Sequence, residues 1–119
     1  MPVTNQHNQF IGKWGEQTAI DLLVSKGYTI LDRNVFTPYG EVDLVASFYG
    51  ETVFVEVKTR TSDALGNPED AVTPRKRQRM AKAAAHTAER MQLSAYRLDV
   101  VAITGTPSHI TDITHFENI

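Results

Sequence analysis

Three β-rich runs joined by very short connections lie between two helix-like segments, and this order constrains the fold most. The runs cover residues 28–35, 41–48 and 52–59, with turn signals at Pro38-Tyr39-Gly40 and Tyr49-Gly50. Connections this short favour an antiparallel meander, because parallel neighbours need a crossover of about a dozen residues or more.

The segments around the meander have helical character. Apolar residues recur at helical spacing over residues 10–26, and Gly27 is placed to cap the end of that helix. Thr73-Pro74 supplies an N-cap and the favoured first residue of a second helix, which runs to about Met91. Residues 61–72 are expected to form a loop.

Two more β-rich runs follow, over residues 96–104 and, more weakly, 110–116. Because a helix separates the first of them from the meander, it is a candidate parallel crossover strand. The predicted order is αβββαβ with a further strand at the end. We expect an α/β fold, a central mixed sheet flanked by helices, in a single domain over residues 1–119.

Composition excludes several classes of function. The 119 residues, 41% hydrophobic and 22% charged, are typical of one soluble domain that folds without disulfides or a structural metal. The absence of cysteine removes disulfide frameworks, Cys-based zinc sites and thiol nucleophiles. The start of the chain has no secretory signal, and no apolar run reaches the roughly 20 residues of a membrane span. We expect a cytoplasmic protein with no membrane partner.

The formal net charge of -2 argues against a protein that coats nucleic acid indiscriminately. Basic residues nevertheless gather in one segment: Arg75, Lys76, Arg77, Arg79 and Lys82. Near-helical spacing of Arg75, Arg79 and Lys82 predicts a ridge that contacts phosphates without reading sequence, and Lys76 and Arg60 could join it. The alternative is a solvated helix face.

Acidic and basic side chains share one face of two neighbouring predicted strands. Period-two alternation places Glu56 with Lys58 in the third strand. It likewise places Glu41 with Asp43 in the second. A hairpin loop of two or four residues puts Asp43 opposite Glu56, and Glu41 opposite Lys58, so that all four side chains meet. A three-residue loop would move Asp43 to the other face.

Two opposed carboxylates repel each other, and a hard divalent cation would relieve that repulsion. Asp43 and Glu56 are therefore a candidate Mg²⁺ anchor, to which the backbone carbonyl of Val57 could add an oxygen. Lys58 would project beside the metal, where it can contact a scissile phosphate and help to position or deprotonate the attacking water. The alternative is a surface hairpin with cross-strand ion pairs, such as Glu41 with Lys58.

Glu16 is a further candidate because it shares the apolar stripe of the first helix with Ala19 and Leu23. A helix packed on the hairpin could carry this acid to the edge of the metal site. Alternatively, the side chain lies at the helix flank and reaches water. The candidate catalytic residues are Asp43, Glu56, Lys58, Glu16 and Glu41.

Four motifs together form a specific string. They are Gly15-Glu16, GEVDLV at residues 40–45, FVEVKTR at 54–60 and AVTPRK at 71–76. The string resembles the YraN family of bacterial proteins over roughly residues 15–99, and it is far more specific than an isolated Glu-x-Lys.

That family is similar to the restriction-endonuclease-like fold, which includes archaeal Holliday-junction resolvases and the tRNA-endonuclease-like group. The resemblance implies a three-layer αβββαβ core and a Mg²⁺ (or Mn²⁺) ion held by Asp43 and Glu56. It also implies a catalytic role for Lys58 and an acidic helix residue matching Glu16. Val42 stands where the PD-(D/E)xK motif has proline, as is common in resolvase-like members.

The sequence therefore predicts a Mg²⁺-dependent PD-(D/E)xK endonuclease that acts on DNA, with branched or repair intermediates as candidate substrates. Resemblance to resolvases also suggests a homodimer. The rival prediction is a non-catalytic nucleic-acid-binding or adaptor module that retains the fold. Its binding would depend on the basic residues 75–82 but not on Glu56.

Overall fold

The computed structural model of the chain describes residues 2–61 and 72–119. Its elements are α1 (Pro2–Ser25), β1 (Thr29–Thr37), β2 (Gly40–Phe48), β3 (Glu51–Arg60), α2 (Pro74–Arg90), β4 (Arg97–Thr106) and β5 (His109–Phe116). The predicted order αβββαβ is confirmed, and β5 is the expected last strand. Of the loop predicted at residues 61–72, positions 62–71 lie outside the described residues.

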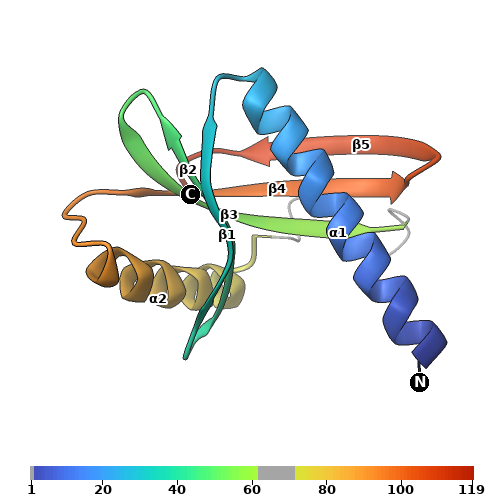
Figure 1. The fold of residues 1–119 in the computed structure, drawn as a ribbon, viewed down its shortest axis with the longest axis horizontal. Helices are drawn as coiled ribbons and strands as arrows, with labels where there is room; N and C mark the ends of the chain where they lie inside the picture. The colour runs from blue at the N-terminus through green and yellow to red at the C-terminus, as the bar shows by residue number, and fades with distance from the viewer. Residues whose placement is uncertain (1, 62–71) are drawn as a thin grey trace.

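The strands form one mixed sheet in the order β1-β2-β3-β4-β5. The first three make the predicted antiparallel meander, and β4 runs parallel to β3 after the crossover through α2. β5 returns antiparallel to β4. Figure 1 shows α1 crossing the strands, with α2 in a different place from α1. Because α1 packs on one face of the sheet and α2 on the other, the sheet is the middle layer of three. The predicted α/β class is confirmed.

Each face of the sheet has its own hydrophobic core. On one face, Leu23 of α1 packs in a cluster with Val55 of β3. On the other face, Ala84 of α2 packs with Phe54. Phe54 and Val55 are adjacent in β3 but belong to different cores, as the alternation of side chains along a strand requires. Even-numbered residues of β3 therefore face α2.

The helix ends follow the predicted local signals. Gly27 has a φ of 100° and, with Tyr28 donating its N–H to the carbonyl of Leu23 at 2.9 Å, closes α1 in a Schellman motif. Thr73 caps α2 by accepting a hydrogen bond from the backbone N–H of Lys76 at 3.3 Å. Over the described parts of the chain, neither helix is both long enough and apolar enough to cross a membrane.

α1 begins earlier than the sequence pattern predicts, at Pro2 instead of residue 10. The extra turns have the sequence PVTNQHNQ, which carries almost no apolar side chains. Helical periodicity can be detected only where apolar residues mark a face, so the pattern gives no sign of this part of the helix.

The β2–β3 hairpin has the register on which the candidate site depends. Its loop is Tyr49-Gly50, because Phe48 pairs with Glu51. Both loop residues have a positive φ, of 50° and 80°, as a type I′ turn requires. The two-residue loop is one of the two lengths that keep the predicted acidic residues within reach of one another.

Candidate active site

The candidate site lies where the β2–β3 ladder ends. The last pair of the ladder is Leu44 with Val55. Beyond this pair, the backbone N–H of Val57 donates to Oδ2 of Asp43 at 2.7 Å. The carboxylate of Asp43 thus satisfies a strand N–H and is held at the point where the two strands part.

The alternation of side chains along β2 changes at the same point. Val42 and Val45 both pack in the core beneath α2, although residues three apart in a regular strand face opposite sides. Asn34, opposite Asp43 in the β1–β2 register, has a φ of 54°. This left-handed conformation is one that asparagine adopts more readily than most residues. With alternation broken, the side chain of Glu41 meets α1.

Three carboxylates converge here, those of Glu16 in α1 and of Glu41 and Asp43 in β2. One oxygen from each lies within 4.8 Å of the other two. We call this group the acidic trio. Nδ2 of Asn34 donates to both carboxylate oxygens of Glu16 at 3.0 Å and to Oε1 of Glu41 at 2.7 Å. Glu16 therefore points toward the sheet, as its place on the apolar stripe of the helix predicts.

The surroundings of Asp43 oppose its negative charge. Burial is the main cause that raises the pKa of Asp43 to about 7. The hydrogen bond from Val57 works in the other direction. Repulsion from the carboxylates of Glu56, Glu16 and Glu41, in decreasing order, adds to the increase. An ionised Asp43 is costly in this position unless a positive charge is close to it.

Glu56 lies in a second group of charges on the α2 side of the sheet. Its carboxylate is 3.7 Å from Nζ of Lys58 and 3.9 Å from Nη2 of Arg79. The side chain of Glu56 is 11% exposed, whereas those of Lys58 and Arg79 are 34% and 54% exposed. The acid is thus the inner member of the group, and the two cations are accessible from outside.

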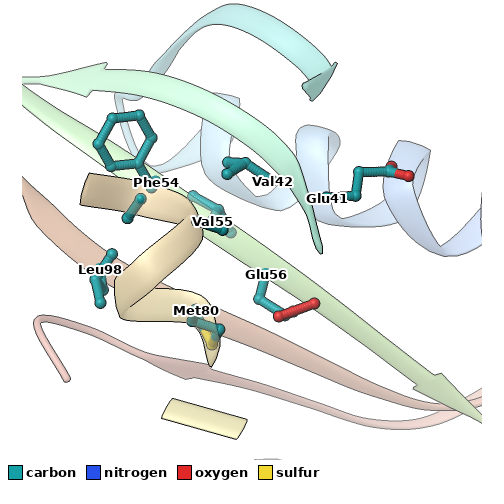
Figure 2. Close-up of a pocket in the computed structure, with 9 residues that line it drawn as sticks. Glu41, Val42, Phe54, Val55, Glu56, Met80 and Leu98 are labelled. Carbon is teal, nitrogen blue, oxygen red and sulfur yellow. The ribbon is translucent and has the colours of Figure 1, made fainter. Parts of the chain in front are cut away.

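An apolar pocket lies beneath this side of the site, between the sheet and α2. Phe54, Met80 and Leu98 are among its walls. Its free volume is about 10 Å³, which is no more than a single water molecule needs. Figure 2 shows the carboxyl groups of Glu41 and Glu56 pointing away from Phe54 and Leu98. A substrate would therefore bind on the open side, where the carboxylates lie.

The structure brings the predicted residues together in two adjoining groups and not in one ring. Asp43 is grouped with Glu16 and Glu41, whereas Glu56 pairs with Lys58. The predicted pairing of Glu41 with Lys58 is wrong: over residues 2–61 and 72–119, Glu41 bonds to Asn34 instead. The cause is the backbone irregularity at Asn34 and Asp43, which strict alternation does not foresee.

The predicted basic ridge lies on the exposed side of α2, where Arg75, Arg79 and Lys82 are all exposed. Arg79 is the member that reaches Glu56. Arg60, at the end of β3, donates from Nε to Thr104 at 3.3 Å. Its Nη2 is buried and has no hydrogen-bond partner within the described ranges.

Sequence reasoning missed Asn34, the residue that links Glu16 to Glu41. In the printed sequence it is a polar position inside the predicted strand 28–35, which looks like an outward-facing residue. The available signal is its residue type, since asparagine is several-fold enriched at left-handed positions. Such a residue within a β-rich run indicates an interruption of the strand.

The chemistry of the donors fits a hard divalent cation. The acidic trio and Glu56 offer carboxylate oxygens, which Mg²⁺ and Mn²⁺ prefer. A second set of close ligand atoms, from Asp99, His115 and Glu117, fits less well. Asp99 already accepts hydrogen bonds from His115 and Arg97, so its oxygens are occupied.

A mixed sheet between two helices is consistent with a three-layer restriction-endonuclease-like core. A model of the uncharacterised protein family UPF0102 matches residues 15–103, and the chain belongs to this family. The predicted resemblance to the YraN family, which is the same family, is confirmed.

Three relatives, each named "UPF0102 protein", illustrate the match. The protein of Trichlorobacter lovleyi is 43% identical over 121 residues, which cover 99% of this chain and 95% of the relative. That of Thermus thermophilus is 44% identical over 96 residues, or 81% and 85% of the two chains. That of Syntrophomonas wolfei is 54% identical over 77 residues, or 65% and 67%. These names state a family and no activity.

Proposed function

We propose that this protein is a Mg²⁺-dependent endonuclease that hydrolyses phosphodiester bonds in DNA. The observation that carries the proposal is the convergence of the acidic trio with Glu56 and Lys58 where the β2–β3 ladder ends. The fold alone would not support it, because one fold serves many functions. The chemistry of these side chains supports it.

Asp43 is the residue that we assign as the principal metal ligand, because it belongs to the acidic trio and is also close enough to Glu56 to feel its charge. Glu56 and the backbone carbonyl of Val57 would complete the set, with Glu16 and Glu41 at its edge. When bound, a divalent cation supplies Lewis-acid polarisation of the phosphate and a water molecule of lowered pKa.

Lys58 would stabilise the charge that develops during cleavage. Water adds to phosphorus while the bond from phosphorus to the leaving oxygen breaks, and negative charge builds on the phosphate oxygens. The ammonium of Lys58 is one-third exposed and is held 3.7 Å from Glu56. It can therefore donate to a phosphate oxygen while keeping its position beside the metal ligands.

The basic side chains support nucleic acid as the substrate. Arg75, Arg79 and Lys82 present exposed cations along α2. Such groups neutralise phosphates and position a strand without reading its bases. Arg79 connects this surface to the site through its contact with Glu56.

A nuclease screen tests the proposal. Single-stranded, duplex, flap and four-way DNA, with an RNA hairpin for comparison, would be incubated with Mg²⁺ or Mn²⁺. We expect cleavage of at least one DNA substrate, and a loss of about 100-fold or more in Asp43→Asn and Lys58→Met. Matched controls are Asp21→Asn and Lys13→Met, which change exposed residues on the outer side of α1.

The outcomes separate the two predicted classes of protein. If the wild type cleaves nothing with either cation, or if Asp43→Asn cleaves as well as Asp21→Asn, the enzyme proposal fails. If the protein binds DNA in a salt-sensitive way but neither cleaves it nor binds Mn²⁺, the adaptor module is favoured instead. Preferential cleavage of the RNA hairpin would support phosphodiester hydrolysis but make RNA the substrate instead of DNA.

A further inference from the structure

We propose that Asn34 is a positioning residue that holds Glu16 and Glu41 in the arrangement that binds the cation. This inference rests on the proposed function, because it assigns a role within the same site. Asn34 is not part of any motif identified in the sequence, and it would contact the two carboxylates and not the substrate.

The hydrogen bonds of the Asn34 amide carry the inference. Nδ2 has two N–H donors, but three carboxylate oxygens lie within 3.0 Å of it, two from Glu16 and one from Glu41. The nitrogen is therefore shared between acids from two different elements, α1 and β2. Without this bridge, the two carboxylates would repel each other and turn apart.

The lack of charge on Asn34 matters as much as its donors. Within residues 2–61 and 72–119, no ion pair joins a member of the acidic trio to a basic side chain. Glu56, by contrast, has Lys58 and Arg79 beside it. A neutral amide holds Glu16 and Glu41 together without neutralising them, so their negative charge remains available to a cation.

The backbone conformation at Asn34 makes it possible to remove the side-chain amide without disturbing the fold. A φ of 54° costs asparagine little and glycine nothing, whereas most side chains are strained there. Glycine would thus preserve the backbone and remove only the amide. Asn118, in the C-terminal tail, has nearly the same φ of 53° and no described contact with the acidic trio. It provides a matched control.

The experiment compares Asn34→Gly with Asn118→Gly by calorimetric titration of Mn²⁺ and by thermal melting. We expect Asn34→Gly to bind Mn²⁺ about 10–100-fold more weakly, as is typical when a residue that orients metal ligands is lost. Melting without metal should stay close to wild type. Asn118→Gly should keep wild-type affinity.

A double-mutant cycle with Glu16→Ala tests the contact directly. If Asn34 acts by holding Glu16, replacing it by glycine should have a smaller effect on Mn²⁺ affinity once Glu16 is absent. Additive losses, or equal affinity of Asn34→Gly and wild type, would overturn the role of Asn34 and leave the nuclease proposal intact. No Mn²⁺ binding by the wild type would overturn both.

Discussion

Gly15 shows how a single residue can set the position of a functional neighbour. A Cβ atom added to Gly15 would overlap Cγ2 of Thr59 in β3, so α1 approaches the sheet as closely as a glycine permits. Thr59 is β-branched and stiff at χ1, so its side chain cannot turn away freely. Glu16, the next residue, owes its closeness to Glu41 and Asp43 to this contact.

Gly15→Ala should therefore destabilise the protein by about 1–3 kcal/mol, because overpacking outweighs the higher helix propensity of alanine. Gly12→Ala is the matched control, since nothing lies within 4 Å of its added Cβ. That change should stabilise the protein by up to about 1 kcal/mol. Urea denaturation of both variants measures the difference, and equal shifts would show that the approach of α1 is not tight.

At the scale of elements, the end of the β2–β3 ladder and helix α2 contribute different charges to the site. The parting strands expose carboxylates, and α2 presents cations on the side where it meets Glu56. Most of the carboxylates thus come from the strands and most of the exposed cations from α2, with Glu16 of α1 and Lys58 of β3 as the exceptions. A phosphate would be attracted by the helix and a metal ion by the strands.

The helix cations should contribute to DNA binding without contributing to metal binding. We expect Arg75→Gln and Lys82→Gln each to lower DNA affinity and to reduce the slope of log K against log salt by about 1. Mn²⁺ affinity should be unchanged in both. Fluorescence anisotropy at several salt concentrations measures the slope, with Lys13→Gln on α1 as control. An unchanged slope would exclude these cations from the DNA interface.

At the scale of the whole molecule, a buried polar network joins distant parts of the chain. Asp99 in β4 is fully buried and bonds to Tyr28, Arg97 and His115. Burial alone would raise the pKa of Asp99, but the hydrogen bonds from His115, Arg97 and Tyr28 and from the N–H of Asn118 outweigh it and lower that pKa to about 2. The network ties the connection between α1 and β1 to β4 and β5, at the end of the sheet away from Thr59.

Asp99→Asn should destabilise the protein by up to about 3–5 kcal/mol at pH 7, because Arg97 loses its fully buried partner and keeps only the half-exposed carboxylates of Glu51 and Glu117. The pKa of Asp99 is depressed in the folded state, so its stabilisation is present above about pH 4. It is lost as the pH falls from about 4 to about 2.

Denaturation with urea across pH measures this dependence. The difference between wild type and Asp99→Asn should shrink below pH 4, and exposed Asp112→Asn should show neither the loss nor its pH dependence. A difference that stays constant down to pH 2 would mean that the charge of Asp99 does not contribute.

Local signals in the sequence were sufficient for much of the fold. Gly27, Thr73-Pro74 and Tyr49-Gly50 each act within a few residues, so the helix ends and the hairpin loop could be predicted from residue type and spacing. These features need no knowledge of distant contacts. Helical periodicity placed Glu16 on the apolar stripe but left open whether its side chain turned to the sheet or to water, and the hydrogen bonds from Asn34 show that it turns to the sheet.

The parts that could not be predicted depend on residues far apart in the chain. Asn34 joins Glu16 to Glu41 only because α1 packs on the face of the sheet beside β1, and the alternation from which Glu41 was placed is interrupted between Val42 and Leu44. Tyr28 reaches Asp99 across 71 positions of the sequence. Patterns of residue spacing describe one element at a time. They therefore identify the acidic residues, but not their division into the acidic trio and the group around Glu56.

The parallel pairing of β3 with β4 also has a consequence for the order in which the chain folds during synthesis. As it leaves the ribosome, the chain presents α1 and the antiparallel meander first, and these make mostly local contacts. β3 then keeps one open hydrogen-bonding edge until α2 and β4 have been synthesised. During that interval the edge beside Val53 and Val55 can pair with another nascent chain.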